Sequence, residues 1–309
     1  MNQKPVVPYS AQFAMLLGFT GAGLVIAALV FGWVAADMLQ VPSTKLTEAL
    51  LKPENVQFSR IANTLFAFVA FFIPAWAVAQ IAYKKPFSAL GFNSVISIKQ
   101  VATVGAISFG ALFLNGAFAV INEMIPMPAS FIAEARKLEE SYQKTMLAMA
   151  NMKHLGDLFI GLLVIAVVPA IFEEVLFRAG LQRILFGLTK HAAVSIIISS
   201  ILFSAIHGSY FGFLPRLVLG VVLGLIYYFS NNLWLAILMH FLNNAVVVVQ
   251  LYVYHQMGKP IKEAMEESMP IWYGIFGLVI VIPSLIYLKK ESTQFLAKQV
   301  VTLDNESMD

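Results

Sequence analysis

Long apolar runs constrain the fold of this chain more than any other feature of its sequence. A helix crosses about 30 Å of hydrocarbon with roughly 20 residues, because it rises about 1.5 Å per residue. Backbone polar groups inside a bilayer must be satisfied within the segment, so we expect each run to form a helix. Eight runs are long enough, or nearly so, and they cover residues 12–36, 61–82, 99–122, 156–178, 191–207, 213–230, 233–254 and 270–288.

The composition agrees with a membrane protein. Hydrophobic residues make up 59% of the 309 positions and charged residues only 12%, which lies outside the range of soluble globular domains. The sequence therefore predicts an all-α, polytopic membrane helix bundle of about eight transmembrane helices. We expect a single integral membrane domain over residues 1–309.

Charge and cysteine content exclude several function classes. The net charge of +3 is spread over loops and tail and forms no basic stripe, so nucleic-acid binding has no support and membrane lipids are the expected counterpart. The chain has no cysteine, which excludes disulfides, thiolate metal sites and a cysteine nucleophile.

The distribution of basic residues gives an expectation for orientation. An even number of spans places both termini on one side, and the 20 Lys and Arg residues divide equally between the two sides. The position of the basic residues therefore decides the expected orientation, because Lys and Arg near helix ends in short segments carry the strongest cytoplasmic bias. We expect cytoplasmic termini and location in the cell inner membrane, on the evidence of Lys84, Lys85, Arg183, Lys190, Lys289 and Lys290.

The longest connection between runs carries an amphipathic pattern at residues 131–152. Apolar side chains recur there at steps of three and four residues, which predicts a helix with one apolar stripe. Such a helix either guides substrate toward a site or only packs on the bundle at the interface, and the second role is the more frequent one. The stripe consists of Phe131, Ala135, Leu138, Tyr142, Met146 and Met149.

Charged residues inside an apolar run indicate a functional site. Each costs roughly 2.5–3.5 kcal/mol near the bilayer centre. In "EEVLFR", Glu174 and Arg178 stand one helical turn apart and can form an ion pair, whereas Glu173 points about 100° away. Unpaired Glu173 is the candidate general base. The alternative is that these residues only tie helices together.

Two further polar clusters, "FSAIH" and "HFLNN", lie in later runs. His207 ends one run, and His240 lies inside another with Asn244 one turn away on the same face. We expect these side chains to meet Glu173 in one cavity of the bundle. Asn243 is expected outside that cavity, since it lies about 100° from Asn244. Single polar residues expected to bridge helices are Asn115, Asn243 and Gln250.

The three clusters, in this order on successive membrane helices, resemble the motifs of the CAAX prenyl protease and bacteriocin-processing (Abi) family of intramembrane proteases. The resemblance covers residues 157–250. It implies that Glu173 and His207 activate a water and that the substrate is a membrane-embedded or lipid-modified peptide or protein. It also implies that Glu174 and Arg178 support the first motif and that His240 and Asn244 stabilise the oxyanion. Phe203 would form part of the pocket wall.

Alternatives remain for both mechanism and function. Glu173, His207 and His240 could instead hold a zinc ion, although the His-Glu-x-x-His spacing is missing, so a metal-free glutamate mechanism is favoured. A proton-coupled transporter would also explain buried ionisable residues, but no paired broken helices appear in matching halves. A non-catalytic scaffold or immunity protein would explain only the helices.

Overall fold

The computed structural model describes residues 4–92, 95–149, 152–259 and 269–306. Over these residues the chain is helical and forms no strand, which confirms the all-α prediction. Within them, seven helices are long and apolar enough to cross a membrane, and the apolar helix Ala192–Ala205 is shorter. The result agrees with about eight spans. The seven are Tyr9–Met38, Pro53–Ala82, Ile98–Glu123, Leu155–Thr189, Phe213–Ser230, Leu233–Gln256 and Tyr273–Ala297.

Most spans are single helices, and two are interrupted by π-helical turns. The second span consists of η2 (Pro53–Asn55), α3 (Val56–Ala67), the π-helical η3 (Phe68–Phe72) and α4 (Ile73–Ala82). The fourth consists of α8 (Leu155–Gly161), π-helical η4 (Leu162–Val167), α9 (Val168–Glu174), π-helical η5 (Val175–Gln182) and α10 (Arg183–Thr189). The remaining long elements are α1 (Tyr9–Met38), α6 (Ile98–Glu123), α11 (Ala192–Ala205), α12 (Phe213–Ser230), α13 (Leu233–Gln256) and α15 (Tyr273–Glu306). Short elements are η1 (Ser43–Lys45), α2 (Leu46–Leu50) and α5 (Pro86–Ala89).

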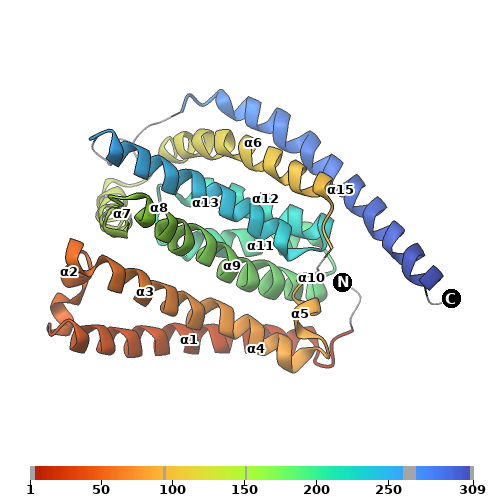
Figure 1. The fold of residues 1–309 in the computed structure, drawn as a ribbon, viewed down its shortest axis with the longest axis horizontal. Helices are drawn as coiled ribbons and strands as arrows, with labels where there is room; N and C mark the ends of the chain where they lie inside the picture. The colour runs from red at the N-terminus through yellow and green to blue at the C-terminus, as the bar shows by residue number, and fades with distance from the viewer. Residues whose placement is uncertain (1–3, 93–94, 150–151, 260–268, 307–309) are drawn as a thin grey trace.

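The spans run roughly side by side, as Figure 1 shows. Helices α1, α3 and α4 form one side of the bundle, α6 and α15 form the opposite side, and the fourth span, α11, α12 and α13 lie between them. Both termini lie at the same end, and α2 and α7 lie at the other. The interior of the bundle is therefore built from residues 155–256.

Packing inside the bundle relies on small residues as well as apolar ones. A Cβ added to Gly220 of α12 would lie 2.9 Å from the Cβ of Ser200 on α11, so these backbones approach closely. The outer surface is apolar, and Leu29 of α1, for example, is 68% exposed. An outer surface of this kind fits a lipid environment.

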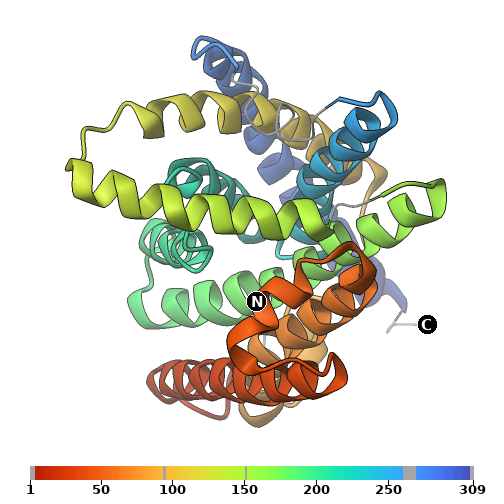
Figure 2. The ribbon, with the colours of Figure 1, turned by 90° about the vertical axis from the view of Figure 1, so that its left-hand side faces the viewer.

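The predicted amphipathic helix is α7 (Ala129–Met149), which connects α6 to the fourth span. It lies across the end of the bundle, as Figure 2 shows. Ala135 of its predicted stripe is buried. The side chain of Met149 and residues 150–151 lie outside the described part of the chain.

Candidate active site

The fourth span carries the first polar cluster at a change of helical geometry. Glu173 and Glu174 are the last residues of α9, and Arg178 lies in the π-helical η5 that follows. Pro169 stands in the first turn of α9 and removes one backbone donor, which coincides with the π-helical η4 before it. π-Helical turns within α-helices often occur at functional sites.

Glu174 and Arg178 form the predicted ion pair. Arg178 Nε lies 3.1 Å from Glu174 Oε2, and both side chains are fully buried. Arg178 Nη2 also donates a hydrogen bond of 3.2 Å to the carbonyl oxygen of Gly220 on α12. Its Cζ atom lies 4.6 Å from the ring centroid of Phe203 on α11. The pair thus joins the fourth span to two neighbouring helices.

The second oxygen of Glu174 holds His240. Glu174 Oε1 lies 2.9 Å from His240 Nδ1 on α13. A carboxylate oxygen accepts, so His240 Nδ1 is the hydrogen-bond donor. Glu174 therefore fixes the ring of His240 through a buried carboxylate–imidazole contact that sequence spacing did not predict.

Glu173 lies between the two histidines, as expected for the unpaired carboxylate. Its Oε2 atom is 4.0 Å from His207 Nε2 and 4.0 Å from His240 Nε2. Polar groups at this separation are too far apart for a direct hydrogen bond and are close enough for one water molecule to bridge them. The side chain is 14% exposed, so it borders the cavity described below.

Both imidazoles present an unprotonated Nε2 to Glu173 when they are neutral. His207 Nδ1 lies 2.8 Å from the carbonyl oxygen of Phe203, and a carbonyl oxygen only accepts, so Nδ1 carries the proton. The contact of His240 Nδ1 with Glu174 has the same effect. A neutral His240 consequently accepts a hydrogen bond at Nε2, and it donates one there only as the imidazolium.

These side chains border one cavity of about 510 Å³. Phe203, His207, His240 and Asn244 line it together with Glu173, so the predicted convergence is observed. Glu174 and Arg178 lie behind this wall, fully buried. Helix α7 contributes the lining residues Tyr142, Thr145 and Met146.

Comparison with protein families agrees with this geometry. Residues 155–246 match the family model described as Type II CAAX prenyl endopeptidase Rce1-like. The match supports assignment of this segment to the CAAX protease family. The matched segment contains all three polar clusters and ends four residues before the extent inferred from the motifs. No curated protein and no solved structure matches the chain.

One expectation about the polar residues of α13 is wrong. Asn243 lines the same cavity as Asn244, although neighbouring residues on a helix point about 100° apart. A cavity of this width borders more than one face of α13. Asn243 Oδ1 accepts a hydrogen bond of 2.9 Å from Asn115 Nδ2 on α6, which confirms the predicted bridge. Asn243 Nδ2 donates to Asn244 Oδ1 at 3.3 Å, so Asn244 keeps its amide nitrogen as a donor.

Arg216 is a cavity residue that the sequence analysis missed. It lies in the first turn of α12 and lines the cavity with Glu173 and the histidines. The guanidinium carbon lies 5.1 Å from the ring centroid of Tyr142 on α7. A signal was present, since Arg216 is the single charged residue in the apolar run 213–230.

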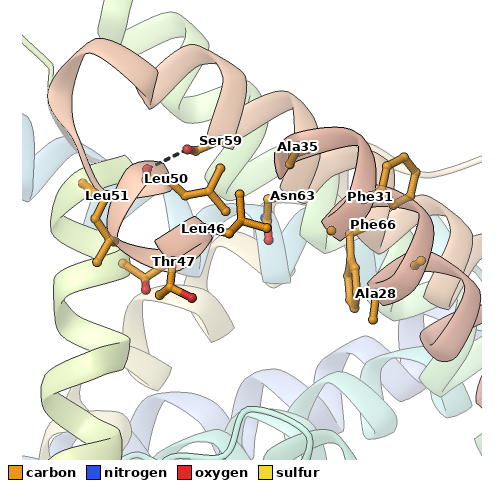
Figure 3. A pocket seen from close by; sticks show the side chains of 15 residues that line it. Ala28, Phe31, Ala35, Leu46, Thr47, Leu50, Leu51, Ser59, Asn63 and Phe66 are labelled. Atoms are coloured by element: carbon orange, nitrogen blue, oxygen red, sulfur yellow. Dashed lines mark hydrogen bonds between the residues drawn. The ribbon is translucent and has the colours of Figure 1, made fainter. Parts of the chain in front are cut away.

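An apolar cavity of about 320 Å³ adjoins the candidate site. Figure 3 shows its lining side chains, which come from α1, α2, α3 and α7. Asn63 and Thr145 line both cavities, so the two are neighbours. Most of the other lining residues are apolar, among them Ala28, Phe31, Leu46, Leu50 and Phe66.

Glu173, His207 and His240 are of residue types that bind metals, but their spacing does not match a zinc site. Imidazole nitrogens whose other N–H is held by a carboxylate or a carbonyl are typical metal ligands. Two ligands of a tetrahedral zinc ion lie about 3.3 Å apart, given bonds of about 2.0–2.1 Å. Glu173 Oε2 lies 4.0 Å from each Nε2, and over the described part of the chain no three His, Asp or Glu side chains meet the geometry of a metal site.

Proposed function

We propose that the chain is an intramembrane endopeptidase that hydrolyses a peptide bond with a water molecule activated by Glu173 and His207. The observation that carries the proposal is the position of Glu173 Oε2, 4.0 Å from both Nε2 atoms in a membrane-embedded cavity. A water molecule placed there contacts the carboxylate of Glu173 and Nε2 of His207. The family match supports a CAAX-type endopeptidase.

The reaction follows from these positions. Glu173 takes a proton from the water while the water oxygen attacks the scissile carbonyl carbon. His207 orients the water through Nε2. The carbonyl oxygen becomes an oxyanion. Donation of the proton from Glu173 to the amide nitrogen then lets the C–N bond break. The products are a carboxylic acid and an amine, and Glu173 regains its starting state.

Two side chains of α13, Asn244 and His240, stabilise the oxyanion. The amide nitrogen of Asn244 is one donor, because its oxygen already accepts from Asn243. His240 is the second donor, as an imidazolium whose positive charge faces the carboxylate of Glu174. Arg178 holds that carboxylate in place from its other oxygen, with Nε 3.1 Å from Oε2. Donors fixed in advance by such contacts are the main source of transition-state stabilisation in acyl transfer.

Zinc catalysis is the alternative mechanism for the same reaction. Glu173, His207 and His240 would hold the ion, with Glu174 and the Phe203 carbonyl supporting the two imidazoles. The zinc ion would act there as a Lewis acid. We favour the metal-free reaction because Glu173 Oε2 lies further from each Nε2 atom than two ligands of one zinc ion lie from each other.

We further propose an apolar or lipid-modified substrate. The apolar cavity shares Asn63 and Thr145 with the site, so an alkyl chain or large apolar side chain held there stays attached to a peptide in the catalytic cavity. Its volume of about 320 Å³ lies at the lower end of typical ligand pockets.

The test of the proposed function is cleavage by purified protein in detergent. The probes are apolar peptides with and without an S-farnesyl cysteine, and the products are identified by mass spectrometry. We expect cleavage at a defined bond that is lost in Glu173→Gln. A transporter has no turnover without two compartments, and a scaffold has none at all. Intact peptides after incubation with folded wild-type protein would contradict the proposal.

A further inference from the structure

Arg216 shares its cavity with Glu173 and forms no ion pair over the described part of the chain. Within those same residues its guanidinium also forms no hydrogen bond, and Nη1 is shielded from solvent without a partner. Taking a charged group out of water costs several kcal/mol unless another group compensates for it. A ligand that enters the cavity can supply that compensation.

The position of the guanidinium is defined by its neighbours. A Cβ added to Gly212 would clash with Arg216 Nη1, so the guanidinium packs directly against the glycine backbone at this place. On another side, Tyr142 of α7 presents its ring to Arg216 at 5.1 Å. The guanidinium of Arg216 thus lies between the start of α12 and α7, the helix that lies across the end of the bundle (Figure 2).

We propose that Arg216 binds the C-terminal carboxylate of the peptide substrate. This inference rests on the proposed peptidase function and adds a specificity residue to it. A guanidinium pairs with a planar carboxylate through two parallel hydrogen bonds. The substrate is then a chain with a free C-terminus close to the scissile bond, since a cavity of about 510 Å³ holds only a short peptide segment.

The location of Arg216 favours this role over oxyanion stabilisation. Asn244 and His240 already provide donors on α13, next to Glu173. Arg216 lies on a different helix, at the end of the bundle covered by α7. An ionised carboxylate is most easily accommodated at that end, because the hydrocarbon centre of the bilayer disfavours charge.

Paired probes test the inference. Each apolar peptide, with and without S-farnesyl cysteine, is prepared as a free acid and as a C-terminal amide, and kcat/KM is measured in detergent. We expect wild-type protein to cleave the acid about 10- to 100-fold faster than the amide. Arg216→Gln should bring that ratio close to one, mainly through KM, and Arg216→Lys should retain part of it. Arg136→Gln, which removes a charge from α7 outside the cavity, is the matched control and should keep the wild-type ratio.

The outcomes separate this inference from the proposed function. If wild-type protein cleaves acid and amide equally, or if Arg216→Gln slows both peptides by the same factor, Arg216 does not read the carboxylate and the peptidase proposal survives. If no peptide is cleaved by folded wild-type protein, both proposals fail. Thermal melting of each variant tests whether a change in the acid-to-amide ratio of kcat/KM comes from unfolding.

Discussion

Glu174 Oε1 lies 2.9 Å from His240 Nδ1 and so links α9 to α13 through two buried side chains. The opposite oxygen of Glu174 faces Arg178 Nε at 3.1 Å. One carboxylate therefore holds an arginine of its own span and a histidine of another. This arrangement leaves Glu173 as the carboxylate that borders the cavity.

Breaking the buried pair from one side should cost more stability than removing both charges. Arg178→Met leaves the Glu174 carboxylate short of its cation, and we expect a loss of about 3–5 kcal/mol. Glu174→Gln/Arg178→Met should lose less stability than Arg178→Met alone, since no buried charge is left without its partner. Unfolding in detergent measures these losses. Lys137→Gln breaks an exposed pair with Glu134 and should change little, whereas additive losses at the buried site would show that Glu174 and Arg178 do not stabilise each other.

Local periodicity explains why much of this architecture could be predicted from the sequence. Apolar runs specify spans through length alone, and the contact between Glu174 and Arg178 depends only on a four-residue step. The pairing of Glu174 with His240 joins positions 66 residues apart, and no helical wheel contains that information. The family motifs indicated that these residues belong to one site, but not which of them contact each other.

Cavity shape accounts for what was missed. Asn243 was assigned to the wrong side because a helical wheel takes no account of cavity width. Arg216 was overlooked because its significance depends on Tyr142 and Gly212, which enclose it only in the folded chain. The π-helical turns before and after α9 were not predicted either, because sequence periodicity assumes regular helices.

Filling the apolar cavity should weaken binding of lipid-modified peptides. Ala28 lines it on α1, and Ala28→Phe would displace part of any bound alkyl chain. We expect KM for the farnesylated peptide to rise about tenfold, as the loss of roughly two buried methylenes at about 0.8 kcal/mol each predicts. Leu29→Phe on the exposed face of the same helix is the matched control. An equal KM for Ala28→Phe and the control would remove the cavity from the substrate path.

The proposed orientation can be tested directly because the chain has no cysteine of its own. In intact cells, a membrane-impermeant maleimide should label Lys137→Cys on α7 and should reach Lys4→Cys only after the membrane is opened. The termini and α7 lie at opposite ends of the bundle (Figure 1). Labelling of Lys4→Cys but not Lys137→Cys in intact cells would invert the orientation and place the α7 side in the cytoplasm.

Metal analysis separates the two hydrolytic mechanisms. We expect purified wild-type protein to contain well under one equivalent of zinc and to keep its activity after prolonged treatment with a chelator. His240→Ala should lower kcat about 10²–10³-fold through loss of an oxyanion donor, without any change in metal content. Stoichiometric zinc that disappears in His240→Ala, together with chelator-sensitive cleavage, would establish the zinc mechanism and leave the peptidase function standing.

Peptide cleavage by Glu173→Gln tests the central claim most directly. Glutamine keeps the shape of the side chain and cannot take a proton from water. We predict that this variant melts like the wild type and cleaves the peptide probes at least about 100-fold more slowly, which is the usual contribution of a general base. A folded Glu173→Gln protein that cleaves the probes as fast as the wild type would contradict the account.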